Sequence, residues 1–486
     1  KSDKNALVTN NDQLQIQLTA SDNQLQAAQN QIKVFESHVC PNAKIIFEND
    51  NVYLSKYCKN HGHQKVLIAD DIDYYKQIRN YNKASEYPLK PHTETKYGCP
   101  YDCGICPDHE QHSCLTLIEI TDRCNLTCPI CYASSSPSCG SHRSLEEIEM
   151  MLDAIVASEG EPDVVQISGG EPTIHPQFFE ILDLAKSKPI KHLMLNTNGL
   201  RIGTDFEFAK RLASYMPRFE IYLQFDSFKP EALLKLRGKD LTKIRQKALD
   251  NLNALNLSTT LVVTLQKGLN DDEIGKIINY ALEQKCVRGV TFQPIQISGR
   301  LEEFDPSKDR LTNTEIRRKI LEQAPVFKPN DLIPVPCNPD ALVMGYALKS
   351  AGEVFPLTSL IDPEALLNNS KNTIVYEHDE VLKGKILDVF STAQSVDTVQ
   401  EGFHDLLCCL PNIVAPELNY SNLFRIIIMN FMDAYDFDVR AIKKSCVHIV
   451  DTDGKVIPFE TMNLFYRNDG LKLKLKVIQE EILPSK

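Results

Sequence analysis

Short apolar runs alternate with amphipathic runs through the middle of the chain, from about residue 115 to 297. The apolar runs are rich in β-branched residues and are typical of buried strands. They are Leu115–Ile120, Val164–Ser168, His192–Asn196, Phe219–Phe225, Thr259–Leu265 and Gly289–Pro294. The runs with helical spacing are Leu145–Ser158, Phe178–Lys186, Phe206–Tyr215, Leu241–Leu255 and Asp272–Gln284. This alternation predicts an α/β fold with a parallel sheet, as a partial (βα)6 barrel or a doubly wound sheet.

The pattern changes on both sides of this central region. Residues 1–36 are polar and rich in Asn and Gln, and we expect a tail or an appended helix there. After residue 300 the strand–helix alternation breaks, and Leu423–Phe437 is a largely apolar candidate helix. The predicted divisions are a tail at 1–36, a small Cys/His module at 37–97, a cysteine segment at 98–114, the core at 115–300 and an α+β auxiliary domain at 301–486.

Composition narrows the functional classes. The 486 residues exceed one ordinary core, so two or three domains are expected. A net charge of −12 argues against broad nucleic-acid binding and against a polybasic membrane anchor. The 15 cysteines stand largely in short C-x2-C and C-x3-C steps, which favours metal binding in a reducing compartment such as the cytoplasm. No stretch of apolar residues is long enough to span a membrane, and no signal peptide is evident.

Three cysteines follow the first apolar run directly. Cys124, Cys128 and Cys131 have C-x3-C-x2-C spacing. Three thiolates can hold three corners of a [4Fe–4S] cube and leave the fourth iron open, which suits catalysis. A zinc site or buried thiols are the alternatives. The spacing, together with Tyr132 and a Gly-Gly-Glu loop farther along, favours an iron–sulfur site.

A second cysteine group precedes this motif. Cys99, Cys103, Cys106 and Cys114 lie within 16 residues, which suits a closed, fully ligated [4Fe–4S] cluster, although zinc would also fit four cysteines.

A third set lies in the N-terminal module, where Cys40, Cys58 and His61 resemble part of a zinc ribbon or a rubredoxin-like site for mononuclear Fe or Zn. Ala43 stands where a fourth ligand is expected, and His63 is a substitute candidate. The alternative is a degenerate module kept for packing.

Polar residues stand at or just after the ends of the predicted strands, where chemistry collects in such folds. Ser168, Gly169, Gly170 and Glu171 end the second strand, and the glycines would let a ligand approach the backbone. The other candidates for ligand contact, for which ordinary turns, solvated polar residues or salt bridges are the alternatives, are Tyr132, Asn196, Asn198, Gln224, Asp226, Arg237 and Gln293. Gln224 and Asp226 would meet ribose hydroxyls, and Arg237 would pair with a carboxylate.

The cysteine triad, the Ser-Gly-Gly-Glu-Pro loop and the six-unit pattern resemble the radical S-adenosylmethionine (SAM) superfamily. The resemblance implies that SAM chelates the open iron, with its amine at the Gly-Gly-Glu loop. Reductive cleavage would then give a 5′-deoxyadenosyl radical that abstracts hydrogen from substrate. It also implies a low-potential electron donor such as ferredoxin or flavodoxin.

A narrower resemblance covers about residues 40–470. The Cys-x2-His-Gly step, the run GCPYDCGICPDHEQHSCL, the triad and a late Cys-Val-His are similar to the tetraether-lipid-synthase-like group, which overlaps with class D-type radical SAM methylases. This resemblance implies a first auxiliary cluster on Cys99, Cys103, Cys106 and Cys114. It implies a second in the region of Cys337, Cys408 or Cys409, and Cys446, although Ala341 replaces an expected cysteine.

Three functions follow from these observations. The first is activation of an unactivated C–H bond for C–C bond formation on a lipid-like chain, with Leu423–Phe437 and Leu406–Val414 as lining of a lipid slot or as ordinary buried segments. A lipid substrate would permit peripheral contact with a membrane. The second is C-methylation of a pterin or another small molecule. The third is a non-catalytic iron–sulfur protein, against which the intact triad and Glu171 argue.

Overall fold

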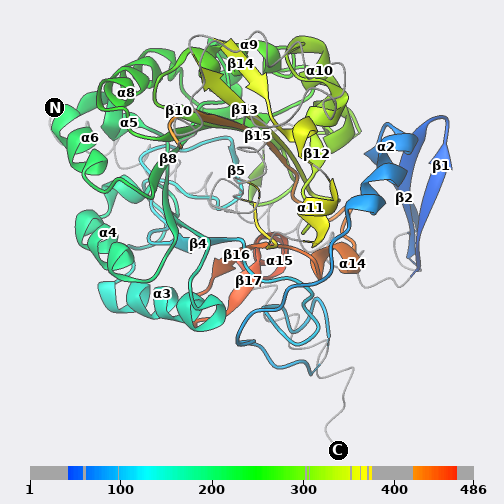
Figure 1. The fold of residues 1–486 in the computed structure, drawn as a ribbon. Coiled ribbons are helices and arrows are strands. Elements are labelled where there is room, and N and C mark those ends of the chain that lie inside the picture. Colours follow the sequence, from blue (N-terminus) through cyan, green and yellow to red (C-terminus); the bar gives the residue numbers. More distant parts are fainter. Residues whose placement is uncertain are drawn as a thin grey trace, which may run out of the picture.

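The computed structural model describes residues 42–58, 62–96, 98–301, 304–305, 307–350, 353–361, 363–368, 371–374, 382 and 420–467. An antiparallel three-stranded sheet comes first, with β1 (Asn42–Glu48), β2 (Asn51–Cys58) and β3 (Gly62–Ala69) in that order. The β1–β2 turn is at Asn49 and Asp50, which have the positive φ angles of a tight hairpin. This sheet stands to one side of the main body (Figure 1), followed by α2 (Ile72–Gln77) and the 3₁₀ turn η1 (Ile78–Tyr81).

The main body is a curved parallel sheet covered by helices on its outer face (Figure 1). Its central strands lie side by side in chain order and confirm the predicted six-unit α/β pattern. They are β4 (Leu115–Glu119), β6 (Val164–Ser168), β7 (His192–Thr197), β8 (Phe219–Gln224), β9 (Thr259–Leu265) and β10 (Val287–Pro294). The connecting helices are α3 (Leu145–Glu159), α4 (Phe178–Ser187), α5 (Leu200–Thr204), α6 (Phe206–Ala213), α7 (Pro230–Arg237), α8 (Thr242–Leu255) and α9 (Ile274–Glu283), with η2 (Pro172–Ile174) after β6. Ser144 and Glu147 form a capping box at the start of α3.

Strands from the C-terminal part of the chain extend this sheet at both edges. β15 (Leu423–Met429) pairs in parallel with β10, and β16 (Val447–Val450) pairs in parallel with β4. β13 (Leu342–Ser350) then continues beyond β15 and β17 (Val456–Pro458) beyond β16. The 301–486 segment therefore completes the wall of the barrel.

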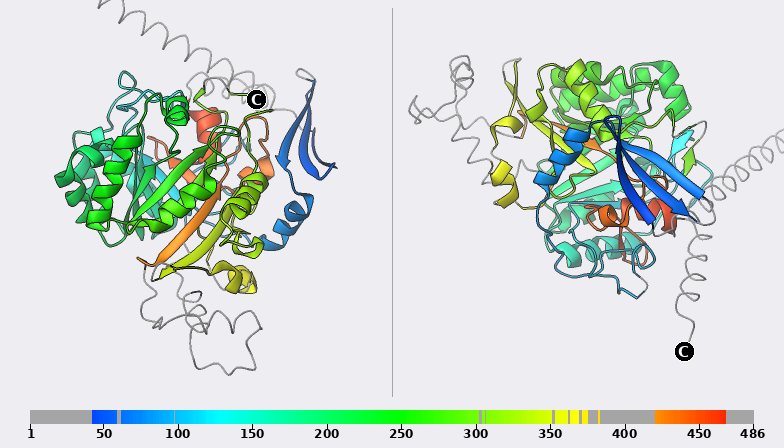
Figure 2. Two further views of the ribbon diagram at one scale, coloured as in Figure 1. Left: turned by 90° about the horizontal axis from the view of Figure 1, so that it is seen from above. Right: turned by 90° about the vertical axis from the view of Figure 1, so that its right-hand side faces the viewer.

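The remaining elements are short or lie at the periphery. They are β5 (Ile130–Cys131), β11 (Arg300–Leu301), α10 (Asn313–Gln323), η3 (Pro329–Asp331), β12 (Ile333–Pro334), β14 (Glu353–Pro356), η4 (Thr358–Leu360), α11 (Pro363–Asn368), α14 (Val439–Ile442), α15 (Phe459–Thr461) and the π-helix η8 (Met462–Tyr466). Two further views show β15 running beside the β13 hairpin, on the side of the sheet away from α4 (Figure 2). Within the described part of the chain, no helix combines the length and the apolar character needed to cross a membrane.

The prediction of a helix at Leu423–Phe437 is wrong, because β15 occupies its first half. Phe424, Ile426 and Ile428 join the core between sheet and helices, whereas Ile427 and Met429 face the inner core of the barrel. This two-residue alternation is the period of a strand, and consecutive isoleucines favour it because β-branched side chains pack well on a pleated sheet.

Candidate functional site

A cavity opens at the carboxyl ends of the parallel strands, enclosing about 1320 Å³ of space that is partly open to solvent. This is the edge of a parallel sheet at which α/β folds commonly bind small molecules. Among the predicted ligand-contact residues, those that line it are Tyr132, Gly169, Gly170, Glu171, Asn196, Asn198, Gln224, Arg237 and Gln293. Ser168 and Asp226 are completely buried behind the wall of the cavity.

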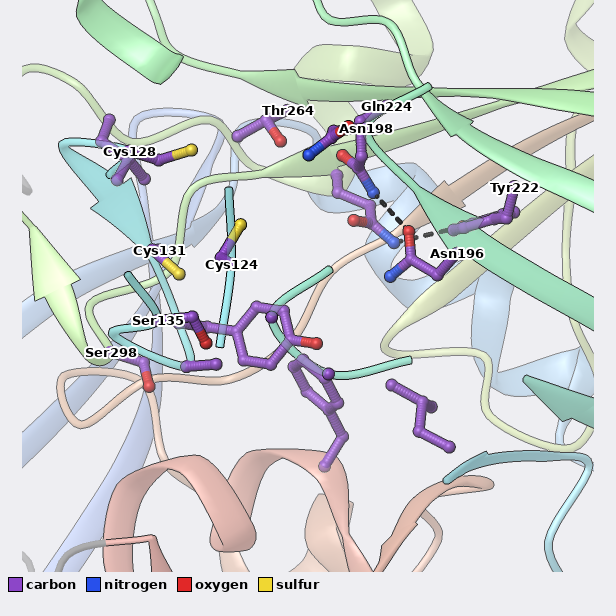
Figure 3. Close-up of a pocket in the computed structure, with 18 of the residues that line it drawn as sticks. Cys124, Cys128, Cys131, Ser135, Asn196, Asn198, Tyr222, Gln224, Thr264 and Ser298 are labelled. Atoms are coloured by element: carbon purple, nitrogen blue, oxygen red, sulfur yellow. Dashed lines mark hydrogen bonds between the residues drawn. The ribbon is translucent and has the colours of Figure 1, made fainter. Parts of the chain in front are cut away.

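The three cysteines of the C-x3-C-x2-C motif lie around one space at the side of this cavity (Figure 3). Cys124 and Cys128 are buried, and Cys131 is half-buried on the short strand β5. Burial raises the pKa of Cys124 to about 12 and also raises that of Cys128. Buried neutral thiols of this kind become thiolate ligands when a cationic metal centre displaces their protons. The donor set therefore fits an iron–sulfur cluster with one open iron.

Arg300 holds the loop that carries these cysteines. Its guanidinium donates to the backbone carbonyls of Cys128 at 2.5 Å, Ser135 at 2.9 Å and Ser134 at 3.4 Å. Its own strand, β11, pairs with β5. A side chain at Gly299 would overlap the carbonyl oxygens of Cys131 and Tyr132, so glycine is required for this approach. Only a Gly-Arg pair after the last barrel strand signals this clamp in the sequence, and we did not predict it.

The Gly-Gly-Glu loop also packs against the cysteine loop. The amide of Gly170 donates to the carbonyl of Thr121 at 2.8 Å, and that of Glu171 donates to Arg123 at 2.9 Å. A Cβ at Gly169 or Gly170 would overlap these carbonyl groups. The glycines thus serve the contact between two backbones as well as the approach of a ligand.

Glu171 is buried and ties two strand ends together. Its carboxylate accepts from the hydroxyls of Thr173 at 2.6 Å and Thr197 at 2.7 Å, and from the amide of Asn198 at 2.8 Å. Burial raises its pKa against the effect of these donors. In this arrangement Glu171 positions the loop. A ligand amine that donates to the Glu171 carboxylate would share its oxygens with these protein donors.

A row of hydrogen-bonded polar side chains crosses the strand ends, and Figure 3 shows its bond between Gln224 and Asn196. Asn196 donates to Ser168 at 3.3 Å, and Gln224 donates to Asn196 at 2.9 Å. Arg237 then donates to Gln224 at 2.9 Å and to Thr264 at 3.0 Å. The row fixes the guanidinium of Arg237 at the cavity surface near Cys128, where its charge partly offsets the rise that burial causes in the pKa of the Cys128 thiol.

Asp226 supports this row and does not contact the cavity, which corrects its predicted role on a ribose. Its carboxylate accepts two hydrogen bonds from Arg237, at 2.6 and 2.7 Å, and one from Arg245 at 2.8 Å. The two guanidinium groups hold the pKa of Asp226 well below its usual range despite burial. Arg237 is therefore part of a buried ion pair and not of a surface salt bridge.

Aromatic residues form the wall beside the cysteine loop. The ring of Tyr132 lies 5.1 Å from that of Phe459, which lies 4.0 Å from Phe431. Arg467 stands 5.5 Å from the Tyr132 ring and forms a bidentate ion pair with Glu119, at 2.8 and 2.9 Å. We call Tyr132, Phe431 and Phe459 the aromatic wall. Two of its members come from the C-terminal segment, so sequence patterns around the triad did not reveal it.

The other cysteines are grouped differently from the prediction. The sulfur atoms of Cys114, Cys337 and Cys446 lie within 4.8 Å of one another and are buried. The predicted grouping of Cys114 with Cys99, Cys103 and Cys106 is therefore wrong, since its thiol lies with those of Cys337 and Cys446. The reason is that the amide of Cys114 pairs with the carbonyl of Cys446, which brings Cys114 to β16.

Cys99, Cys103 and Cys106 line a separate small pocket together. A residue missed by sequence reasoning lies beside the Cys114 group: His112 places Nε2 3.7 Å from the Cys114 sulfur and pairs with Glu159 at 2.9 Å. The remaining predicted ligands Cys40, His61, Cys408 and Cys409 lie outside the described residues. For Cys58, only the backbone, at the end of β2, is described.

Comparisons with known proteins agree with this geometry. Residues 118–281 match the model of the radical SAM superfamily, and residues 39–70 match the HMPTM N-terminal zinc ribbon domain. The chain is 31% identical over 467 residues to 7,8-dihydro-6-hydroxymethylpterin dimethyltransferase of Methanocaldococcus jannaschii, covering 88% of this chain and 91% of that protein. The chain belongs to the radical SAM superfamily. Membership confirms the predicted enzyme class, with a [4Fe–4S] cluster and SAM as cofactors.

Other proteins match a smaller share of this chain. GTP 3′,8-cyclase of Alkaliphilus metalliredigens is 30% identical over 218 residues, covering 43% of this chain and 64% of that protein. Among solved structures, Streptococcus suis SuiB bound to S-adenosylmethionine matches with a TM-score of 0.35 and 15% identity, covering 43% of this chain and 46% of that one.

Proposed function

We propose that this radical SAM enzyme methylates carbon on a pterin or a closely related planar heterocycle. The observation that carries the proposal is the similarity to the pterin dimethyltransferase, which covers 88% of this chain and 91% of that protein, together with the match of residues 39–70 to the HMPTM zinc ribbon domain. The cavity supports it, because its lining combines amide side chains with an aromatic wall, as suits a small polar ring.

In this proposal Cys124, Cys128 and Cys131 hold the cluster at which SAM binds. When bound, the cluster supplies the electron for SAM cleavage. Arg237, fixed by Asp226 and Gln224, offers its guanidinium to the carboxylate of SAM. The Gly169–Gly170 backbone and the Asn196–Gln224 row form the rest of the SAM-binding site. Glu171 holds these two parts in position relative to each other.

The two further cysteine groups would hold auxiliary clusters. Cys114, Cys337 and Cys446 offer three buried sulfur atoms in contact, and Cys99, Cys103 and Cys106 offer three around one small pocket. The N-terminal zinc ribbon would keep a mononuclear metal on Cys40, Cys58 and His61. A low-potential donor such as ferredoxin or flavodoxin would supply electrons.

Coupling of lipid-like chains, which the resemblance placed first, has less support. One of the two segments considered as lining of a lipid slot does contribute Met429 and Phe431 to the cavity, but that cavity also carries amide side chains that an alkyl chain would leave without partners. The other segment, Leu406–Val414, lies outside the described residues. Lipid coupling and peripheral membrane contact stay predictions.

Product analysis separates these functions. Anaerobically reconstituted protein is given a reductant, excess SAM as the source of both the 5′-deoxyadenosyl radical and the methyl group, and either 7,8-dihydro-6-hydroxymethylpterin or a lipid with saturated chains. The products, with S-adenosylhomocysteine as the by-product of methyl transfer, are analysed by mass spectrometry. We expect the pterin to gain one or two methyl groups and the Cys124→Ala variant to make none. Coupled lipid chains together with unchanged pterin would refute the proposal in favour of the lipid reaction.

A further inference from the structure

One polar side chain on the cavity surface lacks the partners that its neighbours have. Gln166, on β6, is 3% exposed and lines the cavity. Its amide nitrogen is buried, and among the described residues nothing accepts a hydrogen bond from it. By contrast, Asn196, Gln224 and Arg237 are bonded to one another along the strand ends.

The register of the sheet explains why Gln166 is unpartnered. Its neighbours on the adjacent strands are Leu117 on β4 and Met194 on β7, neither of which has a hydrogen-bonding group suited to an amide. A buried donor without an acceptor is unfavourable, so such groups in native proteins are commonly satisfied by a bound molecule or by water. The cavity is the direction from which an acceptor can reach Gln166.

The depth of Gln166 distinguishes its partner from SAM. Gln166 lies two residues before Ser168, which places it roughly 6–7 Å farther down the strand than the row at the strand ends. In the proposed function the amine and carboxylate of SAM lie at the cluster held by the cysteine triad, which is beside the row at the strand ends. At the depth of Gln166 the cavity is lined by apolar side chains of β4 and β16: Leu117 is level with Gln166, and Leu115 and Val447 lie two residues deeper.

The same cavity also offers surfaces on which a flat ring can stack. The aromatic wall offers ring faces on which a planar heterocycle stacks. A second amide, Gln293, reaches the hydroxyl of Tyr222 at 3.2 Å, and Gln296 adds another buried amide nitrogen that has no acceptor in the described part of the chain.

We propose that Gln166 is a specificity-determining residue that donates its unpartnered amide N–H to a ring carbonyl or ring nitrogen of a planar heterocyclic substrate. The proposal rests on the proposed function and extends it to a substrate subsite. A pterin offers such acceptors on the rim of a flat ring, whereas an alkyl chain offers none.

The test replaces Gln166 by methionine, which has similar length and no amide. Reconstituted Gln166→Met and wild-type enzymes are titrated anaerobically with 7,8-dihydro-6-hydroxymethylpterin, and separately with SAM, by calorimetry. Gln177→Met is the control, because Gln177 is exposed and its side chain makes no capping bond to α4. We expect Gln166→Met to bind the pterin about tenfold more weakly, as for loss of one buried hydrogen bond, with unchanged affinity for SAM.

Thermal unfolding without substrate gives the second readout. Because the amide nitrogen of Gln166 makes no hydrogen bond to the described residues, Gln166→Met should unfold at no lower temperature than wild type. A variant that unfolds earlier or fails to fold would show that the amide serves the fold, and the inference would be wrong.

The remaining outcomes separate the inference from the proposed function. Equal pterin affinity in Gln166→Met and wild type, with methylated product from both, would overturn the role of Gln166 and leave the function standing. Weaker binding of SAM in place of pterin would assign the amide to the cofactor and also overturn it. If wild type neither binds nor methylates pterin, the proposed function fails and the inference falls with it.

Discussion

Replacing Asp226 by alanine should be among the most damaging single changes near the site. Asp226 is completely buried and accepts hydrogen bonds from Arg237, Arg245 and the amide of Thr264. Removal of one partner of a buried ion pair costs about 3–5 kcal/mol, because the remaining charge is left uncompensated. Two guanidinium groups lose their partner here, so we expect a loss at the upper end of that range.

Anaerobic urea unfolding of the reconstituted protein measures this loss. The control is Asp250→Ala, since Asp250 is exposed on α8 and its change should stay within ~0.5 kcal/mol. Because Arg237 would lose its fixed position, SAM affinity should also fall by about tenfold or more, roughly the value of one hydrogen bond to a charged group. A stability change for Asp226→Ala below ~1 kcal/mol would refute the reasoning that Asp226 carries a compensated buried charge.

The same carboxylate gives a pH dependence. The pKa of Asp226 is depressed in the folded state, so its stabilisation is present above its unfolded pKa of about 3.9 and is lost as the pH falls toward the folded value. The stability difference between wild type and Asp226→Ala should therefore be constant near neutral pH and shrink below about pH 4. A difference that shrinks on raising the pH would contradict this sign.

Three further predictions concern the cysteine loops. Arg300→Ala should lower cluster occupancy, seen as less iron per chain and an altered electron paramagnetic resonance signal, with Arg300→Lys intermediate; unchanged spectra in both would exclude the clamp. Gly170→Ala should also reduce cluster retention because its Cβ meets the carbonyl of Arg123, whereas Gly268→Ala, which has open space around it, should cost only about 1 kcal/mol from its positive φ. If Cys114 belongs with Cys337, the double Cys114→Ser/Cys337→Ser variant should lose no more iron than either single variant; a double loss would restore the predicted grouping with Cys103.

The barrel was predictable because its signals are local. Each strand of the core is a short, mainly apolar run, although Gln166 and Glu220 are buried polar exceptions, and Ser144 and Glu147 mark the start of α3 within four residues. The triad is equally local, since Cys124, Cys128 and Cys131 lie within one loop. Local spacing therefore indicated both the enzyme class and the position of the candidate cluster.

What escaped prediction depends on contacts between distant segments. Cys114 is near Cys106 in sequence, yet its thiol lies with Cys337 and Cys446, because the pairing of β4 with β16 is set by the whole sheet. The apolar run at Leu423 has an ambiguous period, and only the free edge of β10 selects a strand. The Gly-Arg pair at Arg300 is a weak signal in the sequence, and its role as a clamp becomes evident only when β11 is placed against β5.

The closing of both edges by β15 and β16 has a consequence for the order in which the enzyme can be assembled. During synthesis the six core strands emerge from the ribosome long before residues 423–450. Until those residues emerge, β4 and β10 have unpaired, apolar edges. Met429, Phe431, Val447 and Phe459 arrive with those last strands. A nascent or truncated chain that ends near residue 300 would thus be prone to edge-to-edge association and would lack one side of its cavity, so the side formed by the C-terminal strands is among the last parts of the protein to form.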